Sequence, residues 1–219
     1  MSNILNFDTK TETYYSYNRQ EMLKFIPKNS KTILEFGCGK GYFGKLVKST
    51  YSVEYWGVEI DSNSANIATK HIDKIFRGAI EELIDNLPKN NFDCIVFNDV
   101  LEHLVDPYTI LNKCKFLLVA GGVIVSSIPN VRYFGNLYEL IIRKDWKYKD
   151  EGILDKTHLR FFTKKSLENT FQQLNFDIID MEGLSPIKDF RFEILNILTM
   201  GYLADTRFSQ FASVIKPKD

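Results

Sequence analysis

The sequence feature that most constrains the fold is an apolar run that leads directly into a loop of alternating glycines. The run spans Thr32 to Phe36, and Gly37, Gly39 and Gly41 follow it. Apolar side chains then recur at helical spacing from Tyr42 onward. This order predicts a strand, a glycine loop and a helix. Glycine tolerates positive φ and lets a ligand approach bare backbone, so the loop is also a candidate binding element.

The same strand and helix alternation continues along the chain. Apolar or β-branched runs at 55–60, near 75–76, at 92–97 and at 123–127 are separated by helical stretches, one beginning after Asp61 or Ser62 and one running from Pro107 through Leu118. Two closing strands are expected at 176–181 and 208–215, with a helical stretch at 190–203 between them. The pattern predicts an α/β fold, a Rossmann-like, doubly wound and mostly parallel seven-stranded sheet with helices on both faces.

The chain of 219 residues lacks a linker or repeat, so we expect residues 1–219 to form a single domain. Residues 1–30 are expected to cover the ligand site, with Tyr14, Tyr15, Tyr17 and Arg19 in this segment. Residues 131–162, an aromatic and basic stretch, interrupt the alternation and are expected to form a lid insertion on the acceptor side, before Thr163 caps the next helix.

Composition excludes several function classes. Lys plus Arg and Asp plus Glu both number 28, so no basic excess indicates a nucleic-acid partner. No apolar run approaches the ~20 residues of a membrane span, and we expect a soluble, cytoplasmic protein without stable membrane insertion. The three cysteines form no CxxC pair and are expected to be reduced thiols.

The residues around the glycine loop favour a cationic nucleoside as ligand. Glu35, just before the first glycine, would repel a phosphate and suit an ammonium or sulfonium group. Tyr42 stands where the dinucleotide fingerprint requires its third glycine, which disfavours pyrophosphate binding. Glu59 ends the second strand, 20 residues after Gly39, where an acid commonly binds ribose hydroxyls, and Asp61 is the alternative.

The motifs ILEFGCGKG, GVEID and FDCIVFNDVLEHLVDP, followed by the Gly121-Gly122 turn, resemble the class I S-adenosylmethionine (SAM)-dependent methyltransferases. The resemblance implies SAM as cofactor and S-adenosylhomocysteine as product. It implies that the cofactor-binding residues are Glu35, Gly37, Cys38, Gly39, Gly41, Glu59, Ile60, Ala79, Ile80, Asn98 and Asp99.

Two of the three histidines are candidate catalytic residues, because a neutral imidazole can remove a proton from an acceptor. His103 follows the fourth strand, where it could equally be a structural residue at a helix start. His158 lies in a D-x-T-H-x-R-F-F-T block with Asp155, which could orient its ring, and Arg160, which could hold an anionic acceptor. This block resembles a methyltransferase subgroup of bacterial polysaccharide and glycoconjugate pathways.

The carboxyl ends of parallel strands gather ligands in open α/β sheets, so Asn130, Arg132 and Tyr133 after the fifth strand join Arg160 as expected acceptor-binding residues. The stretch from Asn136 to Trp146 mixes apolar and basic residues, and either packs on the domain or rests on a membrane surface. Asp99 and Glu102 alone do not make a carboxylate cluster, so no metal is expected.

Together these features predict a SAM-dependent methyltransferase with a small polar acceptor. The expected reaction is O-methylation of a sugar, a nucleotide-linked sugar or a phosphorylated glycan precursor. Two alternatives stay open: a non-catalytic SAM-binding partner of another enzyme, and a nicotinamide-dependent oxidoreductase on the same fold.

Overall fold

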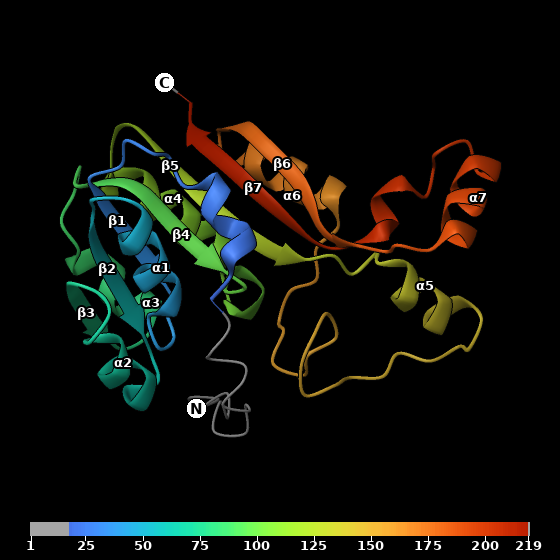
Figure 1. Cartoon of the computed structure of the whole chain (residues 1–219), viewed down its shortest axis with the longest axis horizontal. Coiled ribbons are helices and arrows are strands. Elements are labelled where there is room, and N and C mark those ends of the chain that lie inside the picture. The colour runs from blue at the N-terminus through green and yellow to red at the C-terminus, as the bar shows by residue number, and fades with distance from the viewer. Residues whose placement is uncertain (1–17, 219) are drawn as a thin grey trace.

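A computed structural model describes residues 18–218 and shows one seven-stranded sheet in the order β3-β2-β1-β4-β5-β7-β6 (Figure 1). The strands are β1 (Thr32–Phe36), β2 (Glu54–Glu59), β3 (Lys74–Arg77), β4 (Phe92–Asn98), β5 (Leu118–Pro129), β6 (Phe176–Pro186) and β7 (Phe208–Pro217). The first five strands pair in parallel, and β7 is antiparallel to both β5 and β6. The predicted seven-stranded, mostly parallel sheet is confirmed.

Helices cover both faces of this sheet. They are α1 (Tyr42–Thr50), α2 (Ser62–Ala68), α3 (Ile80–Leu83), α4 (Pro107–Leu117), α5 (Phe134–Ile141), α6 (Lys164–Gln173) and α7 (Phe190–Leu198), with short 3₁₀ turns at Gln20–Phe25, Ile84–Asn86, Leu101–His103 and Ala204–Arg207. Neighbouring residues of one strand enter different cores: Ile33 packs in one buried cluster and Leu34 in the other. This period-two alternation is what a sheet buried on both faces requires.

Local capping explains where several helices begin. Asp61 caps α2 by accepting from the Ser64 backbone N–H at 2.7 Å, and Asp106 caps α4 ahead of Pro107 at its first turn. Thr163 and Ser166 form a reciprocal capping box at the start of α6. These side chains satisfy backbone N–H groups that a helix start leaves without intrahelical partners.

Several predicted boundaries differ from the structure, and β6 extends five residues beyond its expected end to Pro186. The helical stretch expected at 190–203 ends at Leu198, because Met200 and Gly201 adopt positive φ values of 52° and 80° that an α-helix cannot contain. The fifth strand begins at Leu118 rather than Val123. Its register jumps from Leu118 to Val123, with Gly121 at a φ of 81°, so the expected glycine turn is an irregularity inside β5.

The expected lid, residues 131–162, leaves the end of β5, forms α5 and then follows an irregular path back to α6 (Figure 1). Its two ends are fixed to the domain. Asn130 forms an isolated bridge with Phe162, and the backbone N–H groups of Leu159 and Arg160 both donate to the Glu102 carbonyl at 2.8 and 3.0 Å. The insertion is therefore a long loop whose two ends are both held against the domain.

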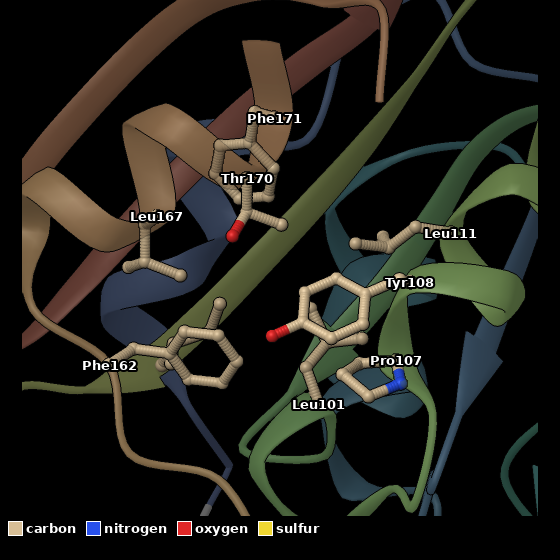
Figure 2. A pocket seen from close by; sticks show the side chains of 9 residues that line it. Leu101, Pro107, Tyr108, Leu111, Phe162, Leu167, Thr170 and Phe171 are labelled. Atoms are coloured by element: carbon tan, nitrogen blue, oxygen red, sulfur yellow. The ribbon is translucent and has the colours of Figure 1, made fainter. Parts of the chain in front are cut away.

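An apolar seam packs the returning insertion against the end of β4 (Figure 2). Phe162, Leu167 and Phe171 face Leu101 and Tyr108 around a void of only 10 Å³, with Pro107, Leu111, Ile128 and Thr170 completing the wall. Burial of the Phe162, Leu167 and Phe171 side chains contributes about 1.5–3 kcal/mol each. The void is about the size of one water molecule, so the seam is part of the core.

Of the expected N-terminal cover segment, Tyr14, Tyr15 and Tyr17 lie outside the described residues. The part from residue 18 onward packs on the domain, with Met22 and Phe25 buried in the same core cluster as α1. Between residues 18 and 218, no helix is both long and apolar enough to cross a membrane.

Candidate active site

A cavity of 830 Å³ opens at the carboxyl ends of β1, β2 and β4, where sequence reasoning placed the ligand. Ten of the eleven expected cofactor-binding residues line it: Glu35, Gly37, Cys38, Gly39, Glu59, Ile60, Ala79, Ile80, Asn98 and Asp99. The exception is Gly41, which precedes the first turn of α1. The other nine of these residues lie up to 64 positions from Glu35 in the sequence. The fold brings all ten into the wall of one cavity.

The glycine loop has the backbone geometry that its sequence predicts. Gly37, Gly39 and Gly41 have φ values of 67°, 53° and 75°, a region that side chains other than glycine rarely adopt. A Cβ on Gly37 would also lie 2.6 Å from Cγ2 of Val100. The loop therefore exposes bare backbone to the cavity, as close approach of a ligand requires.

Glu35 is the acidic group at the centre of the cavity wall. Its side chain is buried and accepts hydrogen bonds from Nδ2 of Asn98 at 2.9 Å and from the Tyr55 hydroxyl at 3.0 Å. Burial raises the pKa of Glu35 from 4.5 to about 7, although both hydrogen bonds oppose the rise, and the nearby Glu59 charge adds to it. A cation beside this carboxylate would compensate for its burial.

Asn98 offers a second group for such a cation. Its Nδ2 is used by Glu35, whereas its buried Oδ1 has no hydrogen-bond donor among residues 18–218. A buried carbonyl oxygen without a donor costs free energy, and an ammonium group would supply the donor. The Glu35 and Asn98 pair thus fits the ammonium end of SAM.

Glu59 lies at the end of β2, and backbone N–H groups donate hydrogen bonds to both of its carboxylate oxygens. Oε2 accepts from the Gly39 N–H at 2.7 Å and Oε1 from the Asp61 N–H at 2.9 Å, and burial raises its pKa. Each oxygen has a second lone-pair direction for a ribose hydroxyl. The alternative, Asp61, caps α2 and does not line the cavity.

The third strand contributes backbone rather than an acid. Gly78 has a φ of 143° and donates from its N–H to the Glu59 carbonyl at 3.0 Å. Ala79 and Ile80 follow it in the cavity wall, with the half-exposed Ile60 from the end of β2. This surface combines apolar side chains with main-chain groups, as an adenine ring requires.

Cys38 is a packing residue. Its side chain is 7% exposed, and burial raises the pKa of its thiol well above the usual range, as do the nearby Glu35 and Glu59 charges. A Cβ on Gly57 would lie 2.5 Å from its sulfur, which shows how closely the thiol sits on β2. A buried, protonated thiol is a poor nucleophile.

Arg19 is a cavity residue whose role was not predicted from sequence. Its guanidinium pairs with Oδ2 of Asp99 at 2.9 Å and contacts the hydroxyl of Ser127 and the side-chain oxygen of Gln210. Asp99 itself has a φ of 54°. Arg19 therefore contacts Asp99 just after β4, Ser127 near the end of β5 and Gln210 near the start of β7.

The two candidate histidines occupy different positions. His103 lines the cavity, and its Nδ1 lies 3.2 Å from both the carbonyl and the hydroxyl oxygen of Thr157. His158 does not line the cavity. Its ring packs edge-on against His103 with centroids 4.6 Å apart, and its Nδ1 is 3.0 Å from the Ile153 carbonyl.

Asp155 contacts Thr157, the residue that directly precedes His158. Its Oδ1 accepts from the backbone N–H of Thr157 at 2.8 Å and from the Thr157 hydroxyl at 2.7 Å. The Thr157 hydroxyl thus points its hydrogen at Asp155 and presents a lone pair to Nδ1 of His103. The D-x-T-H block therefore also contacts His103 through Thr157, a contact that sequence reasoning did not anticipate, and the orientation of His158 by Asp155 stays a prediction.

Glu102 completes a buried cluster with both histidines. Its Oε1 lies 3.9 Å from Nε2 of His158, and one ligand atom from each of Glu102, His103 and His158 lies within 4.8 Å of the others. The expectation of no metal considered Asp99 and Glu102. The structure instead groups Glu102 with two imidazoles, and the expectation stays a prediction.

The four expected acceptor-binding residues do not line the cavity. The Asn130 side chain donates to the carbonyls of Asp205 and Phe208, and Arg132 pairs with Asp205. Tyr133 precedes the first turn of α5, and Arg160 donates to the Val105 carbonyl at 2.6 Å. The insertion reaches the cavity through Lys149, Glu151 and Gly152 instead.

Comparison with known proteins places this geometry in a family. Residues 7–181 match the family model described as a methyltransferase domain. A ubiquinone biosynthesis O-methyltransferase of Actinobacillus pleuropneumoniae is 26% identical over 188 residues, covering 80% of this chain and 78% of that protein. An uncharacterised protein of Methanocaldococcus jannaschii is 30% identical over 146 residues, covering 66% of this chain and 67% of its own length.

Solved structures agree on the fold. A SAM-dependent methyltransferase from Archaeoglobus fulgidus superposes with a TM-score of 0.68 at 20% identity, covering 90% of this chain and 91% of that one. A possible histamine N-methyltransferase from Thermotoga maritima gives a TM-score of 0.62 at 19% identity, with 90% and 86% covered. With the glycine loop, the Glu35 and Asn98 pair and Glu59 in one cavity, the chain belongs to the methyltransferase domain family and is a SAM-dependent methyltransferase.

Proposed function

We propose that this enzyme transfers a methyl group from SAM to a hydroxyl oxygen of a sugar, a nucleotide-linked sugar or a phosphorylated glycan precursor. The observation that carries the proposal is the position of His103 in the wall of the same cavity as the cofactor residues. The curated relative from Actinobacillus pleuropneumoniae is an O-methyltransferase, which supports oxygen as the acceptor atom.

The residues that line the cofactor end of the cavity support SAM as the methyl donor. When bound, SAM supplies a methyl group on an activated sulfonium. Glu35 and Oδ1 of Asn98 would hold its ammonium group, and Glu59 its ribose. Arg19 and Lys149 are the basic side chains in the cavity wall among the described residues, and Arg19 adjoins Asn98 through Asp99. We assign Arg19 to the carboxylate of the methionine portion.

His103 is the proposed base. The Thr157 carbonyl accepts a hydrogen bond and the Thr157 hydroxyl points its hydrogen at Asp155, so both favour a proton on Nδ1 of His103. In the neutral ring this leaves the lone pair on Nε2. Nε2 has almost no exposed surface, so the acceptor must displace a neighbouring side chain to reach it. Hydrogen bonds of this kind commonly tighten only in the substrate complex.

The cavity wall beyond the cofactor residues supports a polar acceptor. Lys149 and Glu151 from the insertion and Gln210 from β7 line it together with His103. These charged and amide side chains include both hydrogen-bond donors and acceptors, so they suit a polyol or a phosphosugar better than an apolar ring. The resemblance of the D-x-T-H-x-R-F-F-T block to methyltransferases of polysaccharide pathways points to the same class.

The test is mass spectrometry of isotope-labelled methyl transfer. Purified enzyme and labelled SAM are incubated with three separate pools: nucleotide sugars, phosphosugars, and phenolic ring compounds of the quinone-precursor type. Label on a sugar hydroxyl supports the proposal, whereas label only on a phenol would replace the acceptor class and keep the methyltransferase.

Two controls separate failure of binding from failure of chemistry. S-adenosylhomocysteine affinity is measured by calorimetry in the same preparation. His103→Ala is run in parallel and is expected to bind the product normally without transferring label. Absence of transfer to every pool despite tight product binding would contradict the proposed acceptor and favour the non-catalytic SAM-binding alternative.

A further inference from the structure

The part of the insertion that returns toward the domain is closed on itself by backbone hydrogen bonds. The Lys149 N–H donates to the Leu154 carbonyl at 2.9 Å, and the Lys149 carbonyl accepts from the Lys156 N–H at 2.9 Å. Gly152 lies between these residues with a φ of 87°, which glycine adopts without strain. We call residues 149–158 the acceptor loop. Its hydrogen bonds hold its first and later residues together as one unit.

The acceptor loop combines residues of the cavity wall with residues of the protein interior. Its cavity-lining residues are Lys149, Glu151 and Gly152. Its buried residues, none of them more than 9% exposed, are Leu154, Asp155, Thr157 and His158. The two groups are directly linked, because Lys149 forms an isolated β-bridge with Asp155. A group bound by the cavity-lining residues would therefore restrain the buried ones.

Thr157 connects the buried part of the acceptor loop to the candidate base. Nδ1 of His103 lies 3.2 Å from the carbonyl oxygen of Thr157 and 3.2 Å from its hydroxyl oxygen. The hydroxyl donates its hydrogen to Oδ1 of Asp155 at 2.7 Å, so it accepts from the imidazole. Both oxygens thus act as acceptors toward the same ring nitrogen. They favour the neutral tautomer of His103 that carries its proton on Nδ1.

The contact made by the Thr157 hydroxyl goes beyond what the local turn needs. Asp155 also accepts from the backbone N–H of Thr157 at 2.8 Å, a contact over two residues by which aspartate commonly stabilises a turn. That contact uses only the main chain at position 157, so valine there would preserve it. The hydroxyl itself contacts Asp155 and His103. Its effect on His103 can therefore be separated from the fold of the acceptor loop.

We propose that the acceptor loop couples acceptor binding to the orientation of His103, with Thr157 as the positioning residue. The inference rests on the proposed function, in which His103 is the base. An acceptor held by Lys149 or Glu151 restrains the loop, and the restrained loop holds Thr157 against Nδ1, which leaves the lone pair on Nε2 for the acceptor hydroxyl. Binding energy from a part of the acceptor away from the reacting oxygen then raises kcat, because it is used to set the base.

The first test measures the tautomer of His103 and needs no acceptor. The full chain with ring-¹⁵N-labelled histidine and S-adenosylhomocysteine is studied by NMR at pH 8, where protonated and unprotonated ring nitrogens give well-separated signals. Loss of signals in His103→Ala assigns those of His103. We expect the proton on Nδ1 in the wild type and a larger share of the Nε2-protonated tautomer in Thr157→Val. Thr157→Ser, which keeps the hydroxyl, should restore the wild-type distribution.

Thr109→Val is the matched control for the lost hydroxyl. The Thr109 hydroxyl also donates to an aspartate, Asp106, at 2.7 Å, but Thr109 lies outside the cavity wall. This variant should leave the signals of His103 unchanged. Unaltered signals in Thr157→Val, an equal change in Thr109→Val, or a proton on Nε2 in the wild type would each overturn the role of Thr157.

The same spectra test the coupling, through a change in the cavity-lining part of the acceptor loop. Gly152→Val places a β-branched side chain at a positive φ, so it should open the loop and shift the signals of His103 in the same direction as Thr157→Val. Gly201→Val is its control, because Gly201 also has a positive φ, 80°, with open space around it and no place in the cavity wall. If Gly152→Val left His103 unchanged while retaining S-adenosylhomocysteine binding, the coupling would be absent.

Turnover on the nucleotide-sugar and phosphosugar pools gives a second readout. Thr157→Val should lower kcat about fivefold, the effect of one lost hydrogen bond, with Thr157→Ser near the wild type. Lys149→Met removes the charge and keeps the backbone contacts of the loop, and it should lower kcat as well as raise KM. A raised KM with unchanged kcat would contradict the coupling. If neither pool accepts label, the proposed reaction fails, whereas the NMR spectra still decide the role of the acceptor loop.

Discussion

Glu35 and Asn98 meet at the carboxyl ends of two adjacent parallel strands, with Nδ2 of Asn98 donating to Oε1 of Glu35 at 2.9 Å. The pair puts a buried carboxylate and an amide oxygen at the point where the cofactor's cation is expected. Its chemistry determines how cofactor binding should respond to pH.

Affinity for SAM should depend on pH through Glu35. The pKa of Glu35 is raised to about 7, so the carboxylate is largely neutral at pH 6 and ionised at pH 8. The ionised form attracts the cation, and we expect affinity at pH 6 to be about tenfold weaker than at pH 8. Calorimetry across this range measures it. The variant Glu35→Gln should bind weakly with a flat profile, and an unchanged slope in that variant would exclude Glu35 as the titrating group.

The same residue should lower the stability of the protein at high pH. The folded-state pKa of Glu35 lies above the ordinary glutamate value of 4.5, so the folded protein binds more protons than the unfolded chain between pH 4.5 and about 7. The free energy of unfolding must then fall as pH rises through this window, by about 2–3 kcal/mol from this group. Urea unfolding of wild type and Glu35→Gln at pH 5 and pH 8 checks this. The variant should show the smaller difference between the two pH values.

Gly39→Val should abolish cofactor binding. Gly39 has a φ of 53° and donates its N–H to Glu59, so a β-branched side chain would strain the loop and occupy space that the ligand needs. Gly121→Val is the matched control, because Gly121 also has a positive φ, 81°, but lies away from the cavity with open space around it. Normal S-adenosylhomocysteine binding in Gly39→Val would remove the loop from the cofactor site.

His103→Ala should lower turnover by about 10²-fold or more with little change in cofactor affinity, as expected for loss of a general base. His158 was the stronger candidate from sequence. The variant His158→Ala should nevertheless have the smaller effect on turnover, because His158 does not line the cavity. Steady-state kinetics, with whichever acceptor the isotope-labelling experiment identifies, separates kcat from KM. If His158→Ala alone lost turnover, the assignment of the base to His103 would be wrong.

A chelator should leave turnover unchanged. Mg²⁺ prefers oxygen ligands, and the cluster of Glu102, His103 and His158 supplies one carboxylate beside two imidazoles. This set would suit Zn²⁺ better, so the measurement compares rates before and after EDTA and after added Zn²⁺. A rate that falls with EDTA and returns with Zn²⁺ would contradict the expectation of a metal-free enzyme.

Local chemistry in the sequence was sufficient to predict the sheet and to bring most of the expected cofactor-binding residues into one cavity, although their contacts with the cofactor stay a prediction. The run Thr32 to Phe36 forms β1 with the predicted bounds, and Asp61 and Thr163 cap the helices they precede. These signals act over a few residues, where strand pattern and capping geometry dominate. Glu59 lies at the end of β2 and in the cavity wall, because the intervening helix sets the spacing from the glycine loop to the second strand; its contact with the ribose stays a prediction.

The acceptor side could not be predicted in the same way, because its contacts join distant segments. Thr157 meets His103 across 54 positions, and Arg19 meets Gln210 across 191. Sequence reasoning did not anticipate that Asp155 accepts from the Thr157 hydroxyl, which in turn lies beside His103. Arg132 and Asn130 were expected to bind the acceptor, but they bind the segment before β7, whose approach no local pattern indicates.

The insertion is fixed at its base, where Phe162 bridges Asn130 and where the Glu102 carbonyl receives two N–H groups. Between these anchors, residues 134–152 contribute no buried side chain to the core. Changes in the length or composition of this stretch should therefore not disturb the sheet or the glycine loop. Residues 134–152 can therefore vary independently of the glycine loop, Glu35 and Glu59, which all lie on the sheet side of the two anchors.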